Sequence, residues 1–166
     1  MVTFGRIHIE SPWAAESGMK TGVQRFLEGY ISDVDKQLFT TVPMTRWYSA
    51  EAVFHAQDGK DYLGAESIGS WMRGTVFGAF EKVTHDLNSY YEISGADEGG
   101  SSLVFFHAMR RVFLKGNLSE QSDVVVPLLW LCRVGKADSE VAPMGLQLQE
   151  VWMSWDTGAV LRALKN

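Results

Sequence analysis

Residues 48–85 read YSAEAVFHAQDGKDYLGAESIGSWMRGTVFGAFEKVTH, and the pattern of this stretch constrains the fold most strongly. The compact run at residues 52–56 is rich in β-forming side chains, and Asp58-Gly59 supplies the positive φ that a tight turn requires. Apolar residues then recur at helical spacing from Ile68 to Phe80, so one face of a helix must be covered. The stretch therefore predicts a strand, a turn, an amphipathic helix and the start of a second strand.

The second strand is predicted to continue to residue 93 with the alternation of a half-buried strand. Its apolar face would carry Val83, His85, Leu87, Tyr91 and Ile93. Its other face would carry Asp86, Asn88, Tyr90 and Glu92. His85 is thus expected to point to the apolar side, and Asp86 points away from it and is not its orienting carboxylate.

The flanking segments complete an α+β pattern. A helix is predicted over residues 19–38, because its apolar side chains fall on one face: Val23, Phe26, Leu27, Tyr30, Val34 and Leu38. A short helix is predicted around Arg46, which is expected to pair with Asp33 or Asp35. Further strands are predicted at residues 103–114, 124–134 and 144–155, followed by a short helical tail. We expect one domain over residues 19–166, preceded by an N-terminal arm at residues 1–18.

The composition of the chain argues against several classes of partner, location and cofactor. The net charge of −5, with Arg110-Arg111 as the basic pair, argues against a nucleic-acid surface. No run of about 18 apolar residues predicts a membrane span. The single cysteine, Cys132, excludes an internal disulfide and suits a reducing compartment, so we expect a soluble cytoplasmic protein. No nucleotide, flavin, haem or metal motif is present, so the sequence predicts no cofactor and no metal.

Three pieces of the sequence carry a family resemblance: AEAVFHAQDG at residues 50–59, LGAESIGSWM at 63–72 and THDLNSYYEISG at 84–95. In this order they resemble the SnoaL-like polyketide cyclase branch of the nuclear transport factor 2-like superfamily, over about residues 20–164. The resemblance implies a curved antiparallel sheet of five or six strands, shaped as a cone, with three or four helices closing a central pocket. It also implies pairing of two copies through the outer sheet face, and the largely apolar predicted strands agree with a homodimer.

The resemblance also selects candidate catalytic residues. Tyr30 and His85 match a tyrosine and a histidine that face the pocket in the scytalone dehydratases of the superfamily, although Ile31 stands where those enzymes have an aspartate. A neutral histidine can move a proton near pH 7, and a phenol can polarise a carbonyl or a water. For each residue the alternative is a core side chain whose polar atoms are satisfied locally.

Three other residues are candidate acids or bases. His55 ends the first strand, and alternation leaves its direction open. His107 or Arg110 can point into the pocket, but not both in a regular strand, and we favour His107. Glu150 shares a predicted face with Leu146, Leu148 and Trp152, where burial would make it a general acid. Its alternative is a pair with Arg110 or Arg111. The acid pair of ketosteroid isomerases is absent.

The sequence therefore predicts a cofactor-independent isomerase or lyase of secondary metabolism, of cyclase or dehydratase type. The resemblance implies a hydrophobic, polycyclic or polyketide-derived substrate, and the 6 Trp, 9 Phe and 5 Tyr of the chain can line an apolar pocket for it. The residues expected to line that pocket are Phe26, Trp71, Tyr91, Phe105, Met109, Trp130 and Trp152. The alternatives are a pericyclase, which needs mainly a shaped pocket, and a non-catalytic binding or dimerisation module.

Overall fold

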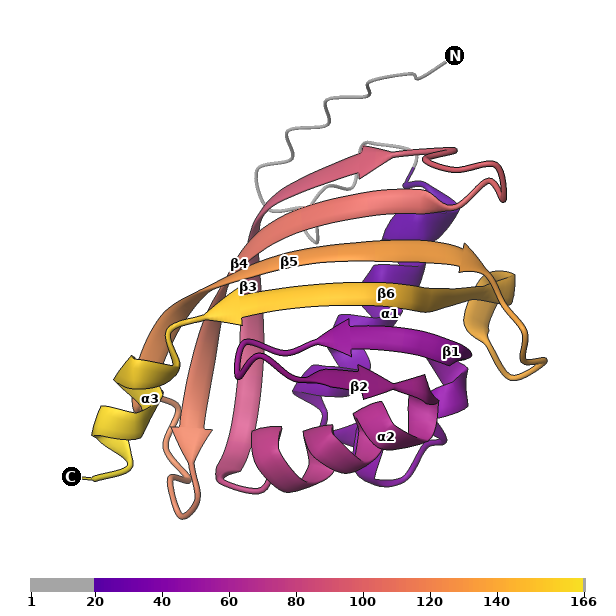
Figure 1. Ribbon diagram of the computed structural model, residues 1–166. Coiled ribbons are helices and arrows are strands. Elements are labelled where there is room, and N and C mark those ends of the chain that lie inside the picture. Colours follow the sequence, from indigo (N-terminus) through magenta and orange to yellow (C-terminus); the bar gives the residue numbers. More distant parts are fainter. Residues whose placement is uncertain (1–19, 166) are drawn as a thin grey trace.

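The computed structural model describes residues 20–165, and this part of the chain forms one curved sheet with helices on its concave side and at its edges (Figure 1). Its six strands are β1 (Tyr48–His55), β2 (Asp61–Leu63), β3 (Phe80–Ile93), β4 (Ser102–Leu114), β5 (Val124–Lys136) and β6 (Leu146–Trp155). The predicted α+β class, with a curved sheet of five or six strands, is confirmed. The N-terminal arm predicted for residues 1–18 lies outside the described residues.

The described residues form three α-helices, α1 (Gly22–Asp35), α2 (Gly64–Trp71) and α3 (Thr157–Ala163). Short 3-10 turns lie at Leu38–Thr40, Met44–Arg46 and Pro143–Gly145, and a π-helical turn at Met72–Val76 follows α2. The helix predicted to reach Phe80 is therefore too long, since Phe80 already begins β3. Gly74 and Gly78 explain the early end, because glycine is a weak helix former and Gly78 lies against the Gly74 carbonyl.

The strands follow the order β2-β1-β6-β5-β4-β3. All neighbours are antiparallel except β1 and β6, which run parallel. The long strands β3 to β6 bend around α1, which lies behind the sheet in the view of Figure 1. The sheet thus has an inner face, packed against α1 in the hydrophobic core, and an outer face.

A β-bulge in β3 reverses the facing of its second half. The pairing of β3 with β4 shifts between Leu87 and Ser89, and Leu87 and Tyr90 are both buried. One extra residue in a strand moves every later side chain to the opposite face. Val83, His85 and Leu87 point inward as predicted, but Tyr91 points outward, and this part of the alternation was wrong.

A second irregularity lies in β6. Its pairing with β5 shifts between Arg133 and Val134, and the consecutive residues Gln147 and Leu148 are both buried. Glu150 shares the outer face with Trp152 but not with Leu148. The prediction that Glu150 shares a face with Leu148 was therefore wrong.

Hydroxyl groups fix the beginning of α1 to the inner face. The Thr21 hydroxyl caps the helix by accepting from the Gln24 amide at 3.0 Å, and donates to Glu92 at 2.7 Å. The buried Glu92 carboxylate also accepts from the hydroxyl groups of Tyr90 and Ser102, at 2.8 and 3.2 Å. This anchor sets where the first turn of α1 meets β3.

Two findings concern the expected compartment. None of the helices within residues 20–165 is long and apolar enough to cross a bilayer. Cys132 is a free thiol in the core, and burial raises its pKa, so the thiol stays protonated at neutral pH. The cytoplasmic location stays a prediction.

Candidate active site

The predicted site residues divide between the two faces of the sheet. On the inner side lie Phe26, Tyr30, His85 and Trp130, with Trp71 at the rim. On the outer side lie His55, Tyr91, Phe105, His107, Met109, Glu150 and Trp152. The set expected to converge on one pocket therefore does not converge.

β4 decides between His107 and Arg110. Its even-numbered residues from Val104 to Val112 are buried, and Arg110 is only 3% exposed. The His107 ring lies on the exposed side, where its Nδ1 is 3.3 Å from the amide nitrogen of Asn88. The prediction that His107 points inward was wrong. His107 and Arg110 are three positions apart, so their side chains lie on opposite faces of a regular strand. The side chain that points inward is that of Arg110.

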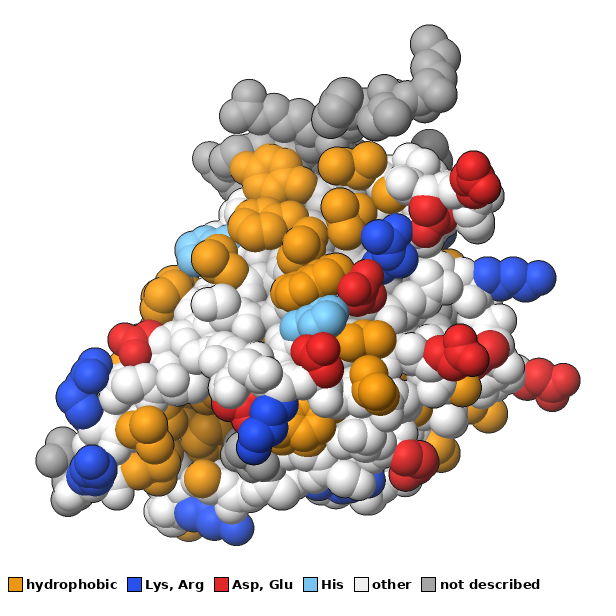
Figure 2. Space-filling model, viewed as in Figure 1, with side chains coloured by type: hydrophobic (Ala, Val, Ile, Leu, Met, Phe, Trp, Pro, Cys, Tyr) orange, Lys and Arg blue, Asp and Glu red, His pale blue; other side chains and the backbone are white. Residues whose placement is uncertain are grey.

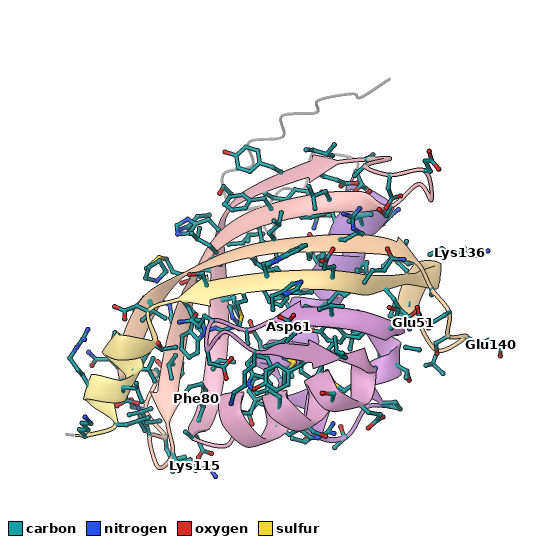
Figure 3. The ribbon with its side chains drawn as sticks, viewed as in Figure 1. Glu51, Asp61, Phe80, Lys115, Lys136 and Glu140 are labelled. Carbon is teal, nitrogen blue, oxygen red and sulfur yellow. The ribbon has the colours of Figure 1, made fainter. Side chains whose placement is uncertain are left out.

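The outer face holds a second group of titratable side chains. The His55 ring lies between two carboxylates, with Nδ1 2.8 Å from Asp61 and Nε2 3.2 Å from Glu150, and stacks on Trp152 at 4.7 Å (Asp61 is labelled in Figure 3). Burial lowers the pKa of His55. The hydrogen bonds that the ring makes with the two carboxylates, together with their negative charges, raise it by more, so the pKa of His55 lies above its usual value. Glu150 lies 3.7 Å from Arg133 and so pairs with neither Arg110 nor Arg111, contrary to that alternative.

Hydrophobic side chains cover much of the outer face around this group (Figure 2). A shallow hollow of about 340 Å³ is bordered by His55, Phe105, Leu129 and Trp152. Phe105 and Leu129 are 38% and 44% exposed. Both ring nitrogens of His55 are thus engaged by carboxylates at the border of this hollow.

On the inner face, His85 is joined to a carboxylate from α1. Its Nδ1 lies 2.6 Å from Oδ1 of Asp35, and its backbone amide donates to Oδ2 of Asp35 at 3.3 Å. The His85 side chain is 2% exposed and that of Asp35 is 26% exposed. The last residue of α1 thus orients a buried imidazole on β3 and links it to solvent.

Arg110 occupies the other nitrogen of the ring, with Nε donating to Nε2 of His85 at 2.9 Å. A guanidinium can only donate and an ionised carboxylate can only accept, so His85 must be neutral with its proton on Nδ1. The pKa of His85 is lowered by burial first and by the Arg110 charge, against the opposing effect of Asp35. The site therefore holds a correctly oriented neutral base whose lone pair is covered by a cation.

Tyr30 contributes to a pair of phenols. Its hydroxyl lies 2.6 Å from the hydroxyl of Tyr48, which donates to the sulfur of Met72 at 3.9 Å. Both side chains are fully buried, and burial raises the pKa of each. Both phenols stay protonated at neutral pH and can donate a hydrogen bond but cannot act as bases.

Aromatic rings fill the space around Tyr30. Its ring centroid lies 5.2 Å from that of Trp130 and 5.7 Å from that of Trp47, which in turn packs on Phe26 at 5.4 Å. Phe26 is fully buried in this cluster, so in this structure it is a core residue. Packing of this kind stabilises the fold and leaves little room for a ligand beside the Tyr30 ring.

Two hollows approach the inner site from its ends. One of about 720 Å³ is open to solvent and is lined by Asp35, Lys36, Lys82 and Phe113, among others. The other, of about 120 Å³, is lined by residues that include Trp71, Met153 and Trp155. The second hollow is smaller than the roughly 300–1,000 Å³ of most drug-sized ligand sites. Neither hollow has Tyr30 or His85 among its lining residues.

Sequence reasoning missed Asp35, Tyr48 and the inward direction of Arg110. The signal for Asp35 was present: Leu27, Ile31 and Asp35 are spaced by four and lie on one stripe of α1. The carboxylate absent at Ile31 is thus supplied one turn later, and the pairing of Arg46 with Asp33, at 3.7 Å, leaves Asp35 free for His85. For Arg110 no sequence signal separates it from its alternatives, since both faces of β4 are largely apolar.

No family model matches the sequence, and no curated protein is significantly similar to it. Solved structures do match its backbone. A nuclear transport factor 2-like superfamily protein from Salmonella enterica serovar Typhimurium aligns with a TM-score of 0.60 at 18% identity, covering 80% of this chain and 87% of that one. The chain has the nuclear transport factor 2-like fold.

Other solved structures with this nuclear transport factor 2-like fold match equally well. The hexachlorocyclohexane dehydrochlorinase LinA-type3 from Novosphingobium barchaimii aligns with a TM-score of 0.62 at 12% identity, covering 81% of this chain and 84% of that one. Aln2 from a Streptomyces species aligns with a TM-score of 0.60 at 17% identity, covering 88% of this chain and 99% of that one. Identities this low establish the fold alone.

Proposed function

We propose that the chain is a cofactor-independent acid–base enzyme, a lyase or isomerase, in which His85 removes a proton from a hydrophobic substrate. The observation that carries the proposal is the 2.6 Å contact between Nδ1 of His85 and Asp35 on the inner face of the sheet. A carboxylate at this position fixes the ring, sets its tautomer and stabilises the imidazolium that forms. Asp35 is the positioning residue and His85 is the base.

The remaining inner groups suit the rest of such a reaction. Proton removal next to a carbonyl develops charge on oxygen, and the protonated phenols of Tyr30 and Tyr48 can donate to that oxygen once their hydroxyl groups turn toward it. The Nε2 lone pair of His85 is available only when Arg110 releases it. Substrate entry must therefore move the Arg110 side chain.

The proposed substrate is a hydrophobic molecule with fused rings or a polyketide origin. The resemblance to SnoaL-like cyclases favours a polycyclic or polyketide-derived substrate that undergoes cyclisation or dehydration. One solved structure with the same fold is named as a dehydrochlorinase, which supports elimination chemistry on this scaffold. The small inner hollow requires Met153 or Trp155 to move before a fused-ring molecule can enter.

The proposal is tested by proton exchange from carbon. The full-length protein is incubated in D₂O with a panel of aromatic ketones, uncharged ones such as 2-tetralone and carboxylate-bearing ones such as 4-acetylbenzoate, and loss of the α-proton signal is followed by NMR. We expect His85→Gln and Asp35→Asn each to slow the catalysed exchange by about 10²- to 10⁴-fold, the usual contribution of a general base.

The chain offers matched controls on the outer face. His107→Gln and Asp61→Asn remove the same functional groups from the outer face, where Asp61 contacts His55 at 2.8 Å. Both controls should retain the full rate. A catalysed exchange that is unchanged in His85→Gln, or no acceleration by the wild-type protein across the panel, would contradict the proposal.

A specific observation favours a second candidate, a non-catalytic binding or dimerisation module. The rings around Tyr30 are packed against one another, and the His85 lone pair is already engaged by Arg110. In that case ligand binding or subunit association would persist in both inner variants, and no member of the ketone panel would exchange.

A further inference from the structure

Arg110 is buried with too few acceptors for its charge. Its side chain is 3% exposed, and among residues 20–165 its donors meet only Nε2 of His85 at 2.9 Å and the sulfur of Met153 at 3.7 Å. The guanidinium also lies 4.9 Å from the ring of Trp155, while its Nη1 has no hydrogen-bond partner in the described part of the chain. A guanidinium carries five donors, so most of them are unused.

The nearest carboxylate does not touch this cation. Asp35 is separated from Arg110 by the His85 ring, which contacts both. Burial lowers the pKa of Arg110 to about 10, so the side chain still carries its charge at pH 7. A buried charge without a directly paired carboxylate is costly to keep, and the cost is recovered when an anion binds.

Trp130 carries a second buried donor without a partner. Nε1 of Trp130 is buried and has no partner within the described residues. Trp130 is the register partner of Met153, which also receives the hydrogen bond from Arg110. Met153 therefore neighbours two residues that each carry a buried donor without an acceptor, and a buried donor of this kind is satisfied by a ligand oxygen.

The 120 Å³ hollow gives a route to these donors. Met153 and Trp155 line this hollow and also contact the Arg110 guanidinium. The unbranched thioether of Met153 can change rotamer readily, and the ring faces of Trp71 and Trp155 suit a flat ligand. The exposed Asp58 at the same hollow disfavours an anion at its solvent end, so the anionic group would point inward.

We propose that Arg110 binds the carboxylate of an aromatic or unsaturated ligand, held by Trp71 and Trp155 and admitted past Met153. The binding site deepens the proposed function, because it gives the substrate an anionic group. It rests on the proposed function only where the ligand is taken to be the substrate. A carboxylate offers Arg110 two oxygens in the geometry that guanidinium prefers.

Ligand binding and the base are coupled by this arrangement. A carboxylate that draws the guanidinium away uncovers Nε2 of His85 and neutralises the cation beside it. The charged groups that act on the ring are Asp35, Arg110 and Asp86, and only Arg110 opposes protonation. The pKa of His85 therefore rises when the ligand binds, and the base becomes active only in the presence of substrate.

The test compares benzoate with benzamide, which has the same ring and no charge. Binding to the full-length protein is followed by tryptophan fluorescence and calorimetry at pH 7. We expect benzoate to bind at least 10-fold more tightly than benzamide, Arg110→Met to remove this preference, and Arg111→Met, the neighbouring arginine on the outer face, to retain it. Equal binding of the two probes, binding of neither, or a preference that survives Arg110→Met would overturn the proposal.

A second measurement needs no variant. The His85 ring is titrated by ¹⁵N NMR with and without each probe, and benzoate alone should raise its pKa. An unchanged His85 titration at saturating benzoate would overturn the coupling.

Asp35→Asn separates the two proposals, because it should slow proton exchange by about 10²- to 10⁴-fold yet preserve the preference for benzoate. If Asp35→Asn leaves exchange unchanged while the Arg110-dependent preference holds, the proposed function fails and the binding site stands.

Discussion

His85 and His55 lie on opposite faces of the sheet, and their pKa values shift in opposite directions. Burial and the Arg110 charge hold His85 neutral, so the folded protein binds its proton less readily than the unfolded chain. The His55 side chain is 28% exposed and lies between Asp61 and Glu150, which make the folded protein bind its proton more readily despite partial burial. Each residue type is the same, and the surroundings alone set its chemistry.

The lowered pKa of His85 should make the free energy of unfolding depend on pH below neutrality. Below about pH 6.5 the unfolded chain takes up a proton at this residue before the folded protein does, so stability falls as the pH is lowered toward the depressed pKa. One such proton corresponds to at most about 1.4 kcal/mol per pH unit. We expect urea denaturation of His85→Gln between pH 5 and 7 to show a shallower fall than the wild type. An identical pH dependence would contradict the lowered pKa.

His55 should act in the opposite sense. Its stabilising contribution is fully present below about pH 6.5 and is lost as the pH rises through the raised pKa of the folded state. His55→Gln should therefore be less stable than the wild type at pH 6, and the difference should shrink as the pH rises above that pKa. The same denaturation series measures this, and a constant difference across the range would show that the loss is packing against Trp152.

At the scale of elements, the approach of β2 and α2 to β1 depends on one residue. Gly64 begins α2 with a φ of +77°, and a Cβ placed there would lie 2.8 Å from the carbonyl oxygen of Ala50. The turn residue Gly59 has a similar φ of +79°, but a Cβ there would meet nothing within 4 Å. The two glycines share the left-handed conformation and differ only in the close contact.

This difference predicts unequal effects of the same substitution. Gly59→Ala should lower the free energy of unfolding by about 1 kcal/mol, the cost of a left-handed alanine. Gly64→Ala should lower it by roughly 2–3 kcal/mol, because the backbone of β1 must also move. Urea denaturation of both variants measures the difference. An equal loss of stability in the two variants would mean that the backbone at Ala50 can move away from the new Cβ without destabilising the protein.

At the scale of the whole molecule, the outer face of the sheet remains exposed. Phe105, Val125 and Leu129 are 38%, 45% and 44% exposed and lie on neighbouring strands β4 and β5. Large exposed apolar patches of this kind mark interaction surfaces. We propose that two copies of the chain pair through this face, which leaves the inner site of each copy accessible from its ends.

The pairing predicts a mass of twice 18.5 kDa in light scattering after size-exclusion chromatography. Leu129→Glu places a charge in the middle of the face and should give the 18.5 kDa monomer. Leu118→Glu is the control, since Leu118 is 87% exposed on the connection between β4 and β5, away from this face. A wild-type monomer would show that the chains do not pair. A dimer that persists in Leu129→Glu would show that they pair through another surface.

The α+β class, the order of the long elements and the inward direction of Tyr30 and His85 were predictable from the sequence. These follow from local periodicity, because a helix repeats every 3.6 residues and a strand every two. The tertiary structure decided the rest. Bulges in β3 and β6 turned Tyr91 and Glu150 outward, and a bulge is a property of strand pairing that alternation cannot show.

The composition of the site was also a tertiary outcome. Asp35 and His85 are 50 positions apart, and they meet only because α1 crosses the concave side of β3. The choice of Arg110 over His107 depended on which face of β4 the sheet closed around. Side-chain type and spacing indicate which groups are available for chemistry, whereas the curvature and register of the sheet determine which of them share a low-dielectric interior.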